Sequence, residues 1–413
     1  MHTIIILASV LLPLIGVMQM EGGAFGNSIG MHGYPNGASV IYVMYAAVLL
    51  GVYFALRAGS AVASTVPTRS GAHFGVYAKL LICLFLLFLL VMLLVFGGWE
   101  VWLGQVGKGK FRAHLGQFGA VAYLLINSVI PLLMAYASVL YRGATGGWRD
   151  HCWLAVLFGL TLLIGSTWGF KSTGITMLLP ALIVLLWGSR MGRVLAVCSV
   201  IALTIVAFFY LFDSKTDEAA GGPTILLTRL TTLQGDVSWL LWNQYSEGAS
   251  FPSYLQTMLV FVGDRAFSIM SGMTREMPDL WADYHFDILI GQLAGLPLSV
   301  VNEGHSIVGT PFADGLVLGG VPGVLTMALF AGLLCGVLCT LIEHALRSGH
   351  GYSCALLVTY FGIYVVTFLR SGVAVQLIHV ASVGGLLMAL ALCVALDRLA
   401  LVCRNEMSPL QKS

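Results

Sequence analysis

The chain has 413 residues, of which 58% are hydrophobic and only 9% are charged, and its formal net charge is +2. Soluble domains carry roughly 25% charged residues, so this composition excludes a water-soluble globule of this size. The small net charge gives no reason to expect a nucleic-acid partner. Apolar runs approach about 20 residues, which predicts membrane-spanning helices rather than barrel strands.

The sequence therefore predicts an all-α polytopic membrane protein with about ten transmembrane helices. The first, Met1–Met18, lacks a basic segment and a small-residue cleavage site, so we interpret it as a retained span rather than a removed signal peptide. The expected spans are 3–20, 39–56, 80–98, 119–140, 152–168, 173–189, 194–212, 315–342, 353–369 and 376–397.

The spans divide the chain into three parts. Residues 1–212 form a membrane bundle of about seven helices, and residues 315–413 add about three helices and a short cytoplasmic tail. Between them lies the one long polar interval, 213–314, which is expected to be a loop or lid over the bundle. Two apolar subsegments of this loop, Ser253–Val262 and Asp287–Val301, are too short to span and predict interfacial helices.

Orientation follows from the basic residues of the loops. With ten spans both termini share one side, and the loops of that side hold eleven Lys and Arg but four Asp and Glu. The other side holds nine basic and fourteen acidic residues. The positive side is expected to be cytoplasmic, which places both termini inside and the 213–314 loop outside the bacterial cytoplasmic (inner) membrane, in the periplasm of a Gram-negative cell.

All eight cysteines lie in apolar segments or at their cytoplasmic ends. We therefore expect neither a disulfide framework nor a Cys-x-x-Cys zinc site. No phosphate-binding loop, dinucleotide fingerprint or His-Glu-x-x-His motif is present, so the sequence shows no equipment for nucleotide-driven catalysis on the cytoplasmic side.

Basic residues that remain outside are exceptions to the positive-inside pattern. Guanidinium and ammonium groups bind phosphate oxygens, so an anionic ligand at the outer boundary would account for them. Lys171 and Arg370 stand out because each lies in a very short connection between spans, where the alternative is snorkelling to lipid head groups. For Arg265 and Arg275 the alternative is pairing with nearby acidic residues of a solvated loop. The candidate ligand-binding residues are Lys171, Arg229, Arg265, Arg275 and Arg370, together with Arg112.

Candidate catalytic residues precede and begin the eighth span. Glu303 and His305 are two residues apart, and Asp314 follows before a glycine-rich stretch. Histidine has an unperturbed pKa near 6.5 and can act as a base or bind a substrate hydroxyl; the alternative is a structural histidine.

The same residues resemble a family. His305-Ser306, followed by Phe312-Ala313-Asp314-Gly315 and Gly319-Gly320-Val321-Pro322-Gly323, looks like the loop-to-helix motif of O-antigen polymerases and the related O-antigen ligases. Arg229-Leu230 with Gln234 resembles the start of the large periplasmic loop of oligosaccharide repeat-unit polymerases. Three further segments resemble shorter turns of that family: Gly169-Phe170-Lys171-Ser172, Arg370-Ser371-Gly372 and, more weakly, Lys110-Phe111-Arg112. Ile307 replaces an aromatic residue that is common in the ligases, which favours the polymerase.

The resemblance implies a GT-C-like membrane glycosyltransferase. Its donor would be a glycan on undecaprenyl pyrophosphate, its acceptor another lipid-linked repeat unit, and its leaving group the lipid pyrophosphate, so the implied reaction needs no metal and no cofactor. His305, Glu303 and Asp314 would then be catalytic, and Gln234 would join the basic residues in binding substrate. Implied partners are membrane lipids, a chain-length regulator and a flippase. The alternatives are an O-antigen ligase that transfers the glycan to lipid A–core and a lipid-linked sugar transporter, although transporters usually place more charge at the membrane midplane.

Overall fold

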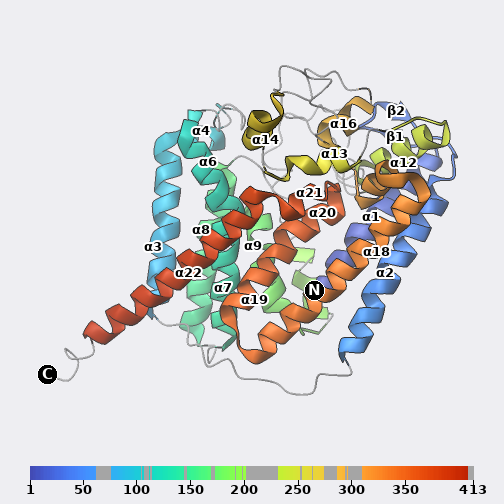
Figure 1. Cartoon of the computed structure of the whole chain (residues 1–413). Coiled ribbons are helices and arrows are strands. Elements are labelled where there is room, and N and C mark those ends of the chain that lie inside the picture. Colours follow the sequence, from blue (N-terminus) through green and yellow to red (C-terminus); the bar gives the residue numbers. More distant parts are fainter. Residues whose placement is uncertain are drawn as a thin grey trace.

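The computed structural model is a bundle of long helices capped at one end by short helices and a small hairpin (Figure 1). It describes the whole chain except residues 62–75, 104, 107–110, 112–113, 144–146, 169–172, 191, 198, 201–230, 252–253, 263, 274–285, 294, 296–308 and 408–413.

Eight helical segments of the described residues are long and apolar enough to cross a membrane. Each coincides with a predicted span, which confirms the all-α polytopic prediction. The ninth, α9 (Thr173–Leu186), is shorter and matches the predicted 173–189 span. Most of the predicted 194–212 span lies outside the described residues, so the number ten and the GT-C-like fold stay predictions. The eight segments are His2–Glu21, Ala38–Gly59, Ala78–Trp102, Val121–Arg142, Trp148–Thr167, Pro311–Ser348, Gly351–Ser371 and Val375–Ala395.

Several of these segments contain more than one helical element. The helices of the bundle are α1 (His2–Glu21), α2 (Ala38–Ala61), α3 (Val76–Leu93), η1 (Leu94–Gly98), α4 (Trp99–Trp102), α6 (Gly116–Leu124), η2 (Leu125–Val129), α7 (Ile130–Gly143), α8 (Trp148–Thr167), α18 (Pro311–Ser348), α19 (Gly351–Thr359), η4 (Tyr360–Val365), α20 (Val366–Ser371), α21 (Val375–Ile378) and α22 (Val380–Met407).

Short elements gather at one end of the bundle (Figure 1). They include the interfacial segments expected within 213–314, because α13 (Tyr254–Met258) with η3 (Leu259–Val262) and α16 (Phe286–Leu293) fall in the two predicted stretches. The others are α12 (Thr232–Ser246), α14 (Asp264–Ser271) and the antiparallel pair β1 (Phe25–Gly26) and β2 (Met31–His32). Much of 213–314 lies outside the described residues, so its role as a lid stays a prediction.

Glycines let the core helices approach closely. On α18, a Cβ added at Gly332 would lie 2.6 Å from the carbonyl oxygen of Leu49 on α2, and one at Gly336 would lie 2.6 Å from Leu56. These two glycines are four residues apart, the spacing at which small residues align on one helix face in membrane bundles. Helices α2 and α18 can therefore pack closely against each other.

The α18 segment is not one straight helix. Its backbone leaves helical geometry at Gly319 and at Gly320, where φ is +62° and ψ is −141°, a conformation open to glycine alone. A Cβ added at Gly315 would lie only 2.8 Å from the amide nitrogen of Val324. Residues nine positions apart in a straight helix would be far more distant. The chain therefore runs as a short helix from Pro311, reverses, and only then crosses the bundle, which corrects the predicted continuous span 315–342.

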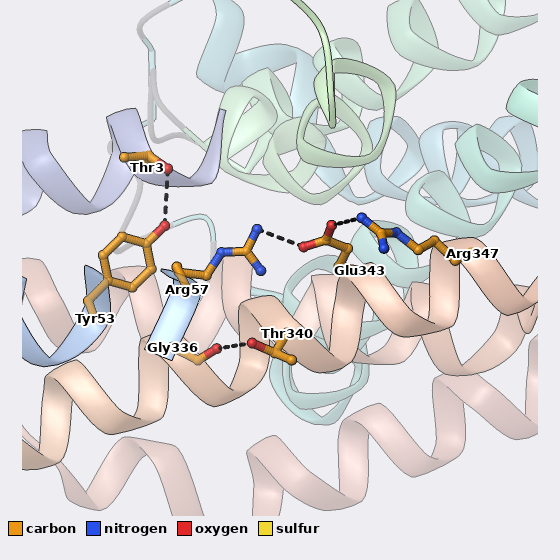
Figure 2. Close-up of polar contacts among 7 residues, drawn as sticks. All are labelled: Thr3, Tyr53, Arg57, Gly336, Thr340, Glu343 and Arg347. Atoms are coloured by element: carbon orange, nitrogen blue, oxygen red, sulfur yellow. Dashed lines mark hydrogen bonds and ion pairs between the residues drawn. The ribbon is translucent and has the colours of Figure 1, made fainter. Parts of the chain in front are cut away.

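Ion pairs at the end opposite the short elements tie the bundle together (Figure 2). Arg57 of α2 pairs with Glu343 of α18 at 2.6 Å, and Arg347 pairs with the other oxygen of the same carboxylate. Lys79 of α3 pairs with Asp150 of α8. The loop count places all five residues on the positive side of the membrane, so these contacts agree with that grouping.

Candidate functional site

The structure describes only part of the predicted site. Asp314, Gln234 and Arg370 are described in full. Arg265 lies in α14, and its side chain is outside the described part of the structure. The other predicted site residues lie outside the described residues, and their roles stay predictions: Glu303, His305, Arg112, Lys171, Arg229 and Arg275.

Asp314 is the centre of the described part of the site. It lies in the first turn of α18, where the positive end of the helix dipole favours a carboxylate, and its side chain is fully buried. Oδ1 accepts the backbone N–H of Val373 at 3.1 Å. Oδ2 accepts the backbone N–H of Ala374 at 3.1 Å and the hydroxyl of Tyr254 at 3.3 Å. With three donors already bound, the carboxylate holds neighbouring segments in place, which favours a positioning role over contact with a substrate.

The segment that Asp314 holds is the turn between the last two membrane spans. Arg370 and Ser371 end α20, and Gly372 caps it with φ +68° while its N–H donates to the carbonyl of Phe368 at 2.8 Å. A Cβ on Gly372 would lie 2.9 Å from Asp314 Oδ1. Glycine thus satisfies both the left-handed backbone and the close approach of the carboxylate.

Val373 continues this turn in a costly conformation. Its φ of +58° is the one positive φ of a non-glycine residue in the part of the chain that the structure describes. A β-branched residue there is strained by about 1–3 kcal/mol and persists only where the surroundings hold it. The bond from its N–H to Asp314 is such a restraint, so the carboxylate offsets strain in the turn that follows Arg370.

A second set of polar groups lies behind Asp314 at the start of the same short helix. Thr310 precedes α18 and is fully buried. Its hydroxyl accepts the hydroxyl of Tyr42 at 3.4 Å and contacts the hydroxyl of Ser238 at 3.2 Å. The Tyr42 ring also packs against Phe312 at 4.9 Å between centroids. Helices α2, α12 and α18 therefore meet at Thr310, and this junction fixes the helix that carries Asp314.

Tyr254 of α13 adds the third donor to Asp314. Burial, followed by the negative charge of Asp314, raises the pKa of the Tyr254 hydroxyl well above its ordinary value of 10. The hydroxyl consequently stays protonated across the physiological range and remains a donor. This contact joins a short helix of the polar 213–314 interval to the membrane bundle.

Arg370 and Gln234 lie at the borders of this cluster. The Arg370 side chain is exposed at the end of α20, three residues before Val373, the first residue that Asp314 binds. Gln234 is half-buried in the first turn of α12, one helical turn before Ser238, which contacts Thr310. The structure thus places the segments that carry both residues next to the Asp314 cluster.

A cavity of about 170 Å³ lies between η2, α7, α9 and η4. Its lining combines apolar side chains with Asn127, Thr173 and Thr176, and Thr173 begins α9 directly after the predicted Lys171 turn. Two π-helical segments, η2 and η4, contribute to its walls and are joined by a 2.8 Å hydrogen bond between Ser128 and Tyr364. Single turns of π-helix occur frequently at functional sites.

One polar anchor was missed by the sequence interpretation. The glycine-rich stretch 22–37 contains the β1–β2 pair and docks on α12. The buried Asp236 accepts the backbone N–H of Ser28 at 3.1 Å, and burial raises its pKa above the ordinary value. Trp239 and Trp242 donate to the carbonyls of Tyr34 and Asn36. These partners are about 200 residues apart in the sequence, and no local pattern marks such a pairing.

Comparison with known proteins adds no relative to this description: no protein-family model matches the chain, and no curated protein or solved structure matches it.

Proposed function

We propose that the protein polymerises oligosaccharide repeat units carried on undecaprenyl pyrophosphate, at the outer face of a bacterial cytoplasmic membrane. Support comes from the polytopic helical fold, from the motifs that resemble O-antigen polymerases, and from the cluster around Asp314. The observation that carries most weight is the turn 370–374, because a buried carboxylate and a strained backbone hold an exposed arginine at a fixed place near the end of the bundle.

In the proposed reaction a hydroxyl oxygen of the acceptor sugar attacks the anomeric carbon of the donor glycan. The bond from that carbon to the lipid pyrophosphate breaks, and the pyrophosphate leaves with the bonding electrons. The hydroxyl proton passes to a base, for which His305 or Glu303 is the candidate. Negative charge develops on the departing pyrophosphate. A cation that is already positioned next to the pyrophosphate oxygens therefore lowers the barrier most.

Arg370 is the described residue best suited to this task. Its guanidinium can bind two phosphate oxygens at once, and its backbone is fixed by the turn that Asp314 restrains. A fixed donor needs little reorganisation during the reaction, which is why preorganised groups contribute more than mobile ones. Asp314 then acts through Arg370 as a positioning residue.

The experiment is reconstitution of the purified protein with a lipid-linked repeat unit, with products resolved by length. The wild-type protein should form a ladder of longer glycans. Arg370→Ala should lower the rate by about 100-fold or more, the loss typical of removing one donor to a developing charge. Arg370→Lys, which retains charge but loses the planar fork, should retain part of the rate. The matched control is Arg398→Ala, which changes an exposed arginine in the C-terminal part of α22 and should leave the rate of elongation unaffected.

Other outcomes identify the alternatives. Transfer of the glycan to lipid A–core without elongation would indicate a ligase. Movement of the lipid-linked unit across a bilayer without a new glycosidic bond would indicate a transporter. Normal ladders from Arg370→Ala at equal protein level would remove Arg370 from the site while leaving polymerase activity in place.

A further inference from the structure

A second polar cavity lies at the opposite end of the bundle from Asp314. It has a volume of about 550 Å³, within the range of small-molecule sites. Three arginines line it, Arg142 from the end of α7 and Arg190 and Arg193 from the segment after α9, and none of the described residues that line it is acidic. Such a concentration of positive charge favours an anionic occupant.

The chain is folded to bring these arginines together. α9 ends at Leu186, and Gly188 turns the backbone with φ +74°, the left-handed geometry that commonly follows a helix C-terminus. Trp187 anchors the turn by stacking on His2 of α1, with ring centroids 4.2 Å apart. Arg190 and Arg193 follow at once, so the turn returns them to the end of α7.

One hydrogen bond holds the Arg142 guanidinium in place. Its Nη1 donates to the carbonyl of Val184 in the last turn of α9 at 2.6 Å, which satisfies one of the carbonyls that a helix end leaves unpaired. This bond fixes the guanidinium plane while the side chain still lines the cavity. A guanidinium held in this way loses less entropy when it binds an oxyanion.

The neighbouring cations of the same end behave differently. Arg57 and Arg347 share the carboxylate of Glu343 (Figure 2). Lys79 pairs with Asp150. Charges that serve only to orient a membrane protein need no common cavity. We propose that the cavity formed by Arg142, Arg190 and Arg193 binds a phosphate-bearing anion, either the head group of an anionic phospholipid or a soluble phosphate. This site is independent of the proposed function, because it lies at the other end of the bundle.

The test measures thermal unfolding of the full chain in neutral detergent and ligand counts by native mass spectrometry. The added probes are phosphatidylglycerol, phosphatidylcholine and sodium pyrophosphate. A ligand that binds the folded state raises the melting temperature as its concentration exceeds its dissociation constant. Phosphatidylglycerol should raise it more than phosphatidylcholine, and the difference should shrink at high salt. Protection by pyrophosphate equal to that of phosphatidylglycerol would identify a soluble phosphate as the source, and protection by the lipid alone would identify the head group.

Variants assign the effect to the cavity. Arg190→Gln with Arg193→Gln should weaken the affinity for the protective probe by about tenfold or more. The matched control is Arg149→Gln with Arg398→Gln, two exposed arginines outside the cavity, and it should retain wild-type protection. If the cavity variant does not fold, Arg142→Lys decides, since it keeps the charge but loses the fork and should bind more weakly. Equal protection of cavity and control variants, or no protection by either anion, would overturn the proposal.

Discussion

Replacing Asp314 by asparagine tests the positioning role of this carboxylate. Its two oxygens accept two backbone N–H groups and one hydroxyl, each within 3.3 Å. An amide offers one oxygen and one NH2 group, so in either orientation a backbone N–H of Val373 or Ala374 must face another donor. A hydrogen bond to a charged group is worth about 1.5–3 kcal/mol, and a buried N–H left unpaired costs a similar amount.

The expected loss of folding free energy is therefore about 2–4 kcal/mol, reduced to the extent that Val373 relaxes from its strained φ. That relaxation moves the turn and with it Arg370. Elongation should consequently fall more steeply than stability does. The assay combines thermal unfolding in detergent with the glycan ladder of the reconstituted protein, measured at a temperature where the variant is folded.

Two variants calibrate this result. Tyr254→Phe removes one donor but leaves both backbone bonds to the carboxylate, so it should lower elongation less than Asp314→Asn. Asp236→Asn alters another buried carboxylate that binds the backbone of the β1–β2 loop, and it should leave glycan length unchanged. Wild-type ladders from folded Asp314→Asn would refute the reasoning, because the turn would then need no carboxylate to present its arginine.

Three further predictions concern stability. Gly372→Ala should destabilise the fold by about 1–3 kcal/mol because of its positive φ and a Cβ only 2.9 Å from a carboxylate oxygen, whereas Gly384→Ala, with open space around it, should be nearly neutral in the same melting assay. Glu343→Gln should lower stability by on the order of 1–2 kcal/mol, since the ion pair between Glu343 and Arg57, each only 20% exposed, would be lost; melting unchanged from wild type would contradict this. Burial raises the pKa of Asp236, so the folded state binds a proton more readily than the unfolded state; its contribution to stability should rise as pH falls from the raised pKa toward 3.8, and Asp236→Asn should remove that slope from melting curves recorded against pH.

The long apolar runs predicted the membrane helices well, because lipid imposes a length and a composition that the sequence must show. All eight described spans fall where the apolar runs lie. The predicted spans also place on one side the residues that pair in space, since Arg57, Lys79, Asp150, Glu343 and Arg347 all lie in loops of the more basic side. These are properties that each segment carries locally.

Reversal of the chain at Gly320 was not predicted. A glycine pair within an apolar run indicates close packing as readily as a break, and only the contact between Gly315 and Val324 distinguishes the two. The hydrogen-bond partners of Asp314 could not be predicted from the sequence either. They lie about sixty residues away in either direction along the chain, at Tyr254 and at Val373, and no local pattern marks such a pairing.

The conformation of Val373 gives the strongest reason to look for function in this turn. Two spans can be joined by many unstrained connections, and glycine or asparagine at this position would remove the cost of a positive φ. Instead the chain keeps a β-branched residue there and offsets its strain with a bond to Asp314, a fully buried carboxylate that itself needs donors. Such mutual restraint gives the turn one geometry. A connection between helices does not need a single fixed geometry. An arginine with the role proposed for Arg370 does need one, because a fixed cation stabilises the transition state without first reorganising.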